Sequence, residues 1–195
     1  FDITVVMLSS SSITHVNMPR TTNAFNQCVR DCKVLRSITI PPTIPYITAI
    51  QKTSVTHLIL PNECKVSGTN LFSDCTYLKK IRAIVTDLPQ NSFYSCSSLM
   101  SLPTFTDTIT SIGTGCFQGC YTINRFVCPP SITTIGSSAF AYTQIVEYDF
   151  TKLPAPPTLV NTNAFAGIQY TAKFYIKAGT LADWLADSNW ATFEN

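Results

Sequence analysis

The feature that most constrains this chain is a short apolar pattern that recurs along nearly its whole length. In each copy, an apolar residue is followed at +3 and +5 by two more, often with proline at +6, as in Leu35, Ile38, Ile40 and Pro41. The middle members of the copies are Val16, Ile38, Leu58, Ile81, Leu102, Phe126, Tyr148 and Phe174, with spacings of 20 to 26 residues. Self-similarity at this period is the signature of stacked repeats, and missing it would give the wrong fold.

The end of each copy alternates apolar and polar residues, which predicts a short strand, and the proline beyond it cannot continue a ladder. Stacking such units buries one continuous core. The sequence therefore predicts an α/β leucine-rich-repeat solenoid with a parallel sheet of about eight short strands, turn-rich or short helical returns and a C-terminal helical cap. We expect one solenoid over 1–195, with an N-terminal edge segment at 1–12, repeats at 13–176 and the cap at 177–195. The chain does not begin with Met, so we expect a fragment of a longer protein.

A second signature precedes most of the predicted strands. Phenylalanine recurs at 72, 93, 117, 140 and 165, and cysteine follows at +3 in the first three copies. Two places break the rule. There is no Phe-x-x-Cys turn between Pro41 and Pro61, and four extra residues separate Phe25 from Cys32. We expect a kink or bulge there.

The last rung of a solenoid would expose its apolar face, so a cap is expected. Thr180 and Asp183 resemble a helix start, and Leu181, Trp184 and Leu185 would share one helical face, followed by Trp190. Both tryptophans of the protein are here, which indicates that this segment covers the exposed end of the core.

Eight cysteines are present. Those at 75, 96 and 120 share one repeat position, with Cys32 expected there too and Thr143 in a later copy. A small, weakly polar residue suits an inward-facing turn, which favours buried free thiols. Local disulfides, Cys28–Cys32 or Cys116–Cys120, and a zinc site are the alternatives. Four-residue spacing is poor for a disulfide, and no histidine completes a zinc site.

Composition limits the partners. The net charge of +2 is far from the basic footprint that binds nucleic acid, so no nucleic-acid partner is expected. No apolar run approaches the ~20 residues of a membrane span, so no direct membrane insertion of this segment is expected. No cofactor or metal is predicted.

The runs 91–102 (NSFYSCSSLMSL), 111–129 (SIGTGCFQGCYTINRFVCP) and 131–140 (SITTIGSSAF) resemble BspA-type leucine-rich repeats. The tail 173–193 is similar to the closing segment of such proteins. The resemblance implies a solenoid displayed on, or secreted from, a microbial cell and used in adhesion to other proteins. It supplies no catalytic residues, and fold likeness alone is a weak argument for function.

The outward positions of the predicted strands form two columns. We predict that this face binds a protein, or a glycan, through His15, His57, Lys80, Arg82, Arg125, Glu147, Asp149, Lys173 and Tyr175. The convex loops and the edges are alternatives, with the predicted long loops 41–57 and 151–165 first among them.

Two catalytic alternatives use the same columns. Ser37 lies between the two histidines, but no acid stands nearby to orient a nucleophile and base. Glu147 and Asp149 could form a glycosidase pair, but Arg125 and Lys173 flank Glu147 as charge partners would. We therefore expect no enzyme. A surface or secreted adhesion module is the main hypothesis, and an intracellular scaffold is the alternative.

Overall fold

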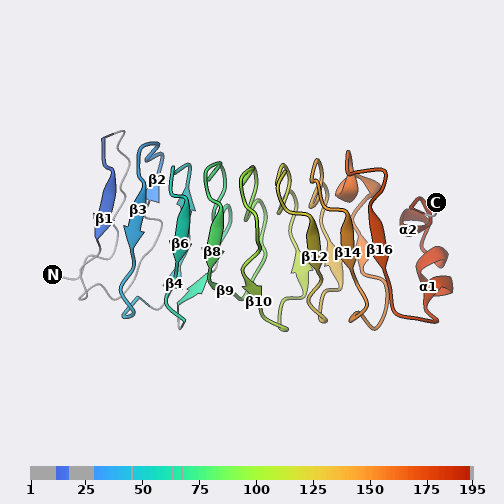
Figure 1. The fold of residues 1–195 in the computed structure, drawn as a ribbon. Coiled ribbons are helices and arrows are strands. Elements are labelled where there is room, and N and C mark those ends of the chain that lie inside the picture. Colours follow the sequence, from blue (N-terminus) through green and yellow to red (C-terminus); the bar gives the residue numbers. More distant parts are fainter. Residues whose placement is uncertain (1–11, 18–28, 45, 63, 67, 194–195) are drawn as a thin grey trace.

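The structure is a computed structural model that describes residues 12–17, 29–44, 46–62, 64–66 and 68–193. The chain winds as a parallel β-solenoid, with β1 (His15–Asn17) at one end and the C-terminal helices at the other (Figure 1). Most turns contribute one three-residue strand to what we call the front sheet. In chain order the described front strands are β1 (His15–Asn17), β3 (Ser37–Thr39), β6 (His57–Ile59), β8 (Lys80–Arg82), β12 (Arg125–Val127), β14 (Glu147–Asp149) and β16 (Lys173–Tyr175). Each is centred on a residue that the apolar pattern predicts, so the predicted solenoid is confirmed. The predicted edge segment 1–12 lies, except for Ser12, outside the described residues.

The front strands pair in parallel as β1–β3, β6–β8 and β12–β14–β16. One predicted strand is missing. The turn around Leu102 joins the front sheet only through a single bridge between Ser101 and Lys80. Pro103 follows at once, and proline has no N–H for a ladder. The pairing toward Arg125 therefore stops at this turn.

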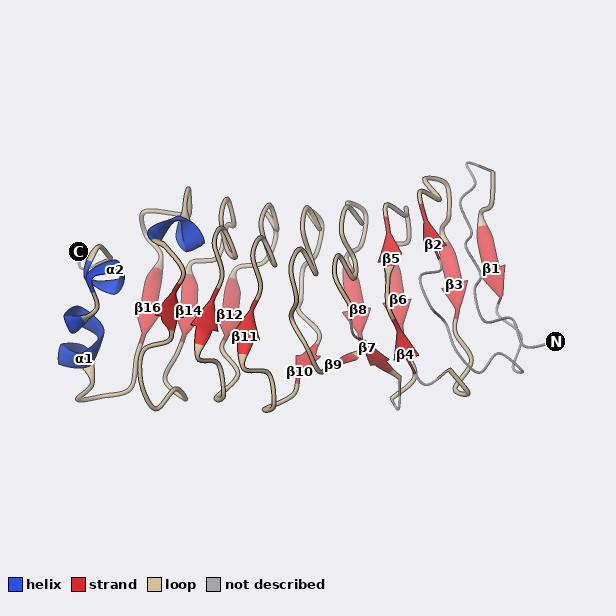
Figure 2. Ribbon diagram, turned by 180° about the vertical axis from the view of Figure 1, so that it is seen from behind, coloured by secondary structure: helices blue, strands red, loops and turns tan. Residues whose placement is uncertain are grey.

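A second set of strands lies behind the front sheet (Figure 2). We call them the back strands. They form two parallel groups: β4 (Tyr46–Ile47), β7 (Lys65–Val66), β9 (Ile84–Val85) and β10 (Thr104–Phe105) in one, and β11 (Ser111–Ile112), β13 (Thr134–Ile135) and β15 (Thr158–Leu159) in the other. The returns between front strands are thus only partly the predicted turns and short helices, the latter represented by a 3₁₀ helix, Thr162–Phe165.

The two irregular turns are regular in space. The Phe72 N–H donates to the carbonyl of Ser92, the residue before Phe93, and the Ile50 N–H donates in the same way to Leu71, the residue before Phe72. Ile50 therefore occupies the phenylalanine position of its turn. Val29 pairs with Ile50, between β2 (Val29–Arg30) and β5 (Ile50–Gln51), and occupies that position in the turn before.

This pairing corrects two predictions. The turn between Pro41 and Pro61 is not missing, because Ile50 and Thr53 replace Phe and Cys. The four extra residues before Cys32 are not an insertion, because Val29 replaces Phe; Phe25 lies outside the described residues. The segment 41–57 is likewise not a long loop. It holds β4 and β5, with Ile44 and Ile47 fully buried.

The residue two after each phenylalanine position reverses the chain. Its φ is positive in every described turn, from 51° to 74°, at Asp31, Lys52, Asp74, Ser95, Gly119, Tyr142 and Gly167. Only two of these seven are glycine. A left-handed residue with a side chain costs roughly 1–2 kcal/mol, so the packing of neighbouring turns must hold it in place.

Phenylalanine rings form the centre of the core. Neighbouring rings lie 5.2 Å apart for Phe72–Phe93, 5.4 Å for Phe93–Phe117 and 5.3 Å for both Phe117–Phe140 and Phe140–Phe165. Aromatic pairs at this separation add to the area that they bury. The stack makes each turn depend on the next one.

The C-terminal cap is two short helices, α1 (Leu181–Ala186) and α2 (Ser188–Ala191). Trp184 lies 5.5 Å from the Phe150 ring and Trp190 lies 5.6 Å from the Phe165 ring, so both tryptophans cover the core as predicted. The predicted helix start is wrong in one respect. Thr180 precedes α1 as its N-cap residue, but its hydroxyl donates to the Lys177 carbonyl and makes no capping hydrogen bond. The Asp187 carboxylate, in contrast, accepts from the N–H groups of Asn189 and Trp190 in α2.

Candidate functional site

The front sheet brings the predicted site residues into two outward columns. The strand register aligns His15 with Ser37, His57 with Lys80, and Arg125 with Glu147 and Lys173. The second column aligns Ile59 with Arg82, and Val127 with Asp149 and Tyr175. All nine predicted residues lie on this face, Glu147 and Asp149 half-buried and the other seven exposed. The geometry agrees with the predicted columns, and their binding role stays a prediction.

Charged groups of the two columns interact near the C-terminal end of the sheet. Arg125 Nη2 lies 3.0 Å from Asp149 Oδ2, and Arg125 Nε lies 3.7 Å from Glu147 Oε2. Asp149 Oδ1 also accepts from the hydroxyl and the N–H of Thr151. The Thr151 hydroxyl and the Arg125 guanidinium lower the pKa of the Asp149 carboxyl. Arg125 on β12 is thus held by two carboxylates of the neighbouring strand β14.

Exposed apolar side chains lie among these charges. Ile59 is 64% exposed, and Val127 and Tyr175 are exposed by 41% and 44%. Isolated apolar residues on a surface are common, but these three share one column with Arg82 and Asp149. The face therefore offers apolar contacts framed by charges of both signs.

A hollow of about 430 Å³ opens where the front sheet is interrupted. Arg125 and Val127 line one side, and Met100 and Pro103 belong to the turn that lacks a front strand. Phe105 and the pair Pro129–Pro130 add apolar surface. Met100 is 67% exposed. Sequence reasoning missed this hollow as a site, although Pro103, which lacks the N–H for pairing, was a signal that could have found it.

The geometry does not support the catalytic alternatives. His15 and His57 each share a hydrogen bond with the neighbouring threonine hydroxyl, Thr14 at 2.9 Å and Thr56 at 3.1 Å. Among the described residues, no carboxylate hydrogen-bonds to either imidazole. A glycosidase needs one carboxyl with a raised pKa, but the pKa of Asp149 is lowered and Glu147 pairs with Arg125.

The seven described cysteines are buried free thiols, as predicted; Cys28 lies outside the described residues. Cys75, Cys96 and Cys120 share one column, and their thiols donate to the carbonyls of Ile50, Phe72 and Phe93 in the preceding turns, at 3.1, 3.0 and 3.2 Å. The predicted substitute Thr143 donates to the Phe140 carbonyl. The proposed Cys116–Cys120 disulfide is absent. Over the described ranges, no cluster of three potential metal ligands occurs.

The structure thus defines a parallel β-solenoid whose front sheet leaves one face open. Residues 2–103 and 48–172 match the model of the BspA type leucine rich repeat region, as six copies. The chain belongs to this family. In the part of the chain that the structure describes, no helix has the length and apolar character to cross a bilayer.

Solved bacterial structures share the fold. A leucine-rich repeat protein from Bacteroides ovatus is 20% identical, with a TM-score of 0.62 over 85% of this chain and 54% of its own. A leucine-rich repeat protein from Eubacterium ventriosum is 19% identical, with a TM-score of 0.51 over 72% and 46%. A leucine rich cell surface protein from Faecalibacterium prausnitzii is 19% identical, with a TM-score of 0.43 over 91% and 63%.

The chain spans about half the length of the first of these proteins, 54%. Among curated proteins, none matches the chain.

Proposed function

We propose that the protein is a non-enzymatic binding module that holds a protein partner on its front sheet. The observation that carries the proposal is the open face itself, where exposed Ile59, Val127 and Tyr175 alternate with Arg82 and Asp149 along one column. Stable interfaces combine apolar and aromatic anchors with a charged rim. The hollow beside Arg125 is the place for one anchoring side chain of the partner.

Surface display or secretion is part of this proposal and rests on membership in the BspA-type family. One observation favours the second candidate, an intracellular scaffold with the same binding face. The seven described cysteines are free thiols, and disulfides are typical of oxidising compartments. Locating the full-length product in its native cell, by surface biotinylation of intact cells, decides between the two.

The binding proposal is tested with a panel of purified extracellular-matrix and cell-surface proteins. The double variant Lys80→Glu/Arg82→Glu reverses two charges on the front sheet. Lys65→Glu/Lys177→Glu reverses two exposed lysines elsewhere and is the matched control. For a partner bound by the wild-type protein, we expect the first variant to weaken binding by about tenfold, mostly at low salt, because rim charges steer association. Unchanged binding by this variant would reject the front sheet as the site.

A further inference from the structure

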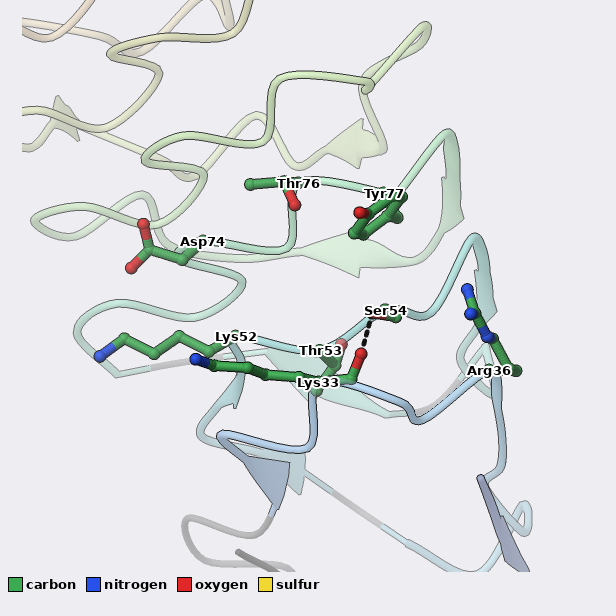
Figure 3. A pocket seen from close by; sticks show the side chains of 8 residues that line it. All are labelled: Lys33, Arg36, Lys52, Thr53, Ser54, Asp74, Thr76 and Tyr77. Atoms are coloured by element: carbon green, nitrogen blue, oxygen red, sulfur yellow. Dashed lines mark hydrogen bonds between the residues drawn. The ribbon is translucent and has the colours of Figure 1, made fainter. Parts of the chain in front are cut away.

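A second hollow, of about 610 Å³, lies at the edge where the turns reverse, and Arg36 in its lining immediately precedes front strand β3 (Figure 3). Lys33 and Arg36 come from one turn, Lys52 and Ser54 from the next, and Asp74 and Tyr77 from the third. The side chains of Lys33 and Lys52 extend in the same direction, and Arg36 stands at the opposite end of the hollow.

A deletion of one residue forms the floor. In the turns on either side, two residues separate the cysteine position from the next core residue, as between Cys32 and Leu35 or between Cys75 and Leu78. In the middle turn only Ser54 lies between Thr53 and Val55. Ser54 is therefore pulled inward, to 5% exposure, beside Thr53 at the buried cysteine position, and the Ser54 hydroxyl donates to the Lys33 carbonyl. The neighbouring turns, which keep full length, form the two walls.

The walls carry a local excess of positive charge. Three cations, Lys33, Arg36 and Lys52, face one carboxylate, Asp74. Lys52 lies 3.8 Å from Asp31, a loose exposed pair. Within the ranges that the structure describes, neither Lys33 nor Arg36 has an ion-pair partner. Because only 12% of the chain is charged, three cations that line one hollow with a single carboxylate make it complementary to an anionic ligand.

The remaining groups distinguish between acidic ligands. Tyr77 is 56% exposed and presents an aromatic ring, Thr76 adds an exposed hydroxyl, and Asp74 can accept hydrogen bonds from ligand hydroxyls. The lining offers no aliphatic pocket for an anchoring side chain, which a peptide would need. An aromatic ring, hydroxyls, one carboxylate and several cations instead suit a sugar that carries acidic groups.

We infer that this hollow, which we call the turn-edge site, binds an acidic saccharide through its carboxylate or sulfate groups. Lys33 and Arg36 pair with the anionic groups, Tyr77 packs against a sugar ring and Asp74 accepts from its hydroxyls. The site shares no residue with the front sheet, so saccharide binding here and protein binding at the front sheet can be tested separately.

Calorimetric titration at low ionic strength tests the site with three oligosaccharides of equal length. A hyaluronan hexasaccharide supplies carboxylates only, a chondroitin sulfate hexasaccharide adds sulfates, and maltohexaose is neutral. We expect one or both acidic sugars to bind and maltohexaose not to bind. The triple variant Lys33→Gln/Arg36→Gln/Lys52→Gln should weaken binding by at least about tenfold, whereas Lys65→Gln/Arg82→Gln/Lys177→Gln, which removes the same charge elsewhere, should not.

A one-residue insertion between Ser54 and Val55 restores the full turn length and should abolish saccharide binding by filling the hollow. Circular dichroism checks that this variant folds; if it does not, the triple glutamine variant carries the test. Lys80→Glu/Arg82→Glu should keep saccharide binding, which separates this site from the front sheet. Hexaglutamate, an acidic peptide, is titrated for comparison. The inference would be overturned if the triple variant and its control bound equally well, or if hexaglutamate bound more tightly than any acidic sugar. It would also be overturned if neither acidic sugar bound at millimolar concentration.

Discussion

Cys96 illustrates how a single residue joins two turns of this solenoid. Its thiol donates at 3.0 Å to the Phe72 carbonyl, and its neighbours Cys75 and Cys120 make the same contact one turn away on each side. Burial raises the pKa of the Cys120 thiol to about 12 and that of Cys64 to about 11. The pKa values of Cys75, Cys96, Cys116 and Cys128 are also raised, again first by burial.

These raised pKa values predict alkaline instability. In the unfolded chain a thiol ionises near pH 8.5, whereas the folded chain keeps it protonated, so its contribution is complete below about pH 8 and is lost as the pH rises. Each such thiol lowers the free energy of unfolding by up to about 1.4 kcal/mol per pH unit above that point. Urea unfolding with reductant, from neutral pH to about pH 10.5, measures the slope.

The matched variant is Cys96→Thr, because Thr143 occupies the equivalent position of another turn and is fully buried there, with its hydroxyl donating to the Phe140 carbonyl of its own turn. It should remain folded and lose one thiol's share of the alkaline slope. An unfolding free energy that stays constant above pH 9, or a slope equal in the two proteins, would contradict the assignment of these cysteines as buried thiols.

At the scale of elements, close approach of backbones fixes the distance between turns. Gly113 follows β11, and a Cβ added there would meet the backbone of Pro89 and Gln90 at 2.5 Å. Gly136 follows β13 and faces Thr114 N at the same distance. The lack of a side chain at these two positions lets the backbones of neighbouring turns touch.

Gly113→Ala should therefore destabilise the protein by about 2–3 kcal/mol, because backbone atoms cannot move aside as a side chain can. Gly179→Ala is the control. Its added Cβ would meet nothing within 4 Å, although its φ of 84° disfavours alanine. We expect a cost of about 1 kcal/mol there. Urea midpoints compare the two, and an equal or smaller loss for Gly113→Ala would show that the turns are more loosely packed than the structure has them.

The elements also show what the sequence could predict. The front strands follow from the +3/+5 pattern, because three alternating residues give a readable period. The back strands, such as Ser111–Ile112, are two residues long and carry no period. Val29 and Ile50 occupy the phenylalanine position with another apolar side chain. The Phe-x-x-Cys motif is therefore absent from two turns whose backbones are regular.

The candidate site was predictable to the same degree. The columns follow from strand register, so the predicted residues do lie on one face. The two hollows do not follow from strand register, because each arises where one copy of the repeat differs from the others. Pro103 interrupts the front sheet beside Arg125, and a missing residue beside Ser54 opens the turn-edge site.

The molecule as a whole is a short solenoid with one open sheet, an aromatic core and a cap at its C-terminal end. Its first solved relative is matched over 54% of that protein's length. The partner that we propose could cover one of three surfaces: the front sheet, the back strands or the turn edge. Which of them it covers is the central question for the proposed function.

Amide hydrogen–deuterium exchange of the protein with and without a bound protein partner answers it most directly. The front-sheet proposal predicts slower exchange on binding in peptides that contain β6, β8, β12 and β14, with the back strands β11 and β13 unchanged. Protection confined to the back strands or to the turn edge, with the front strands unaffected, would contradict it.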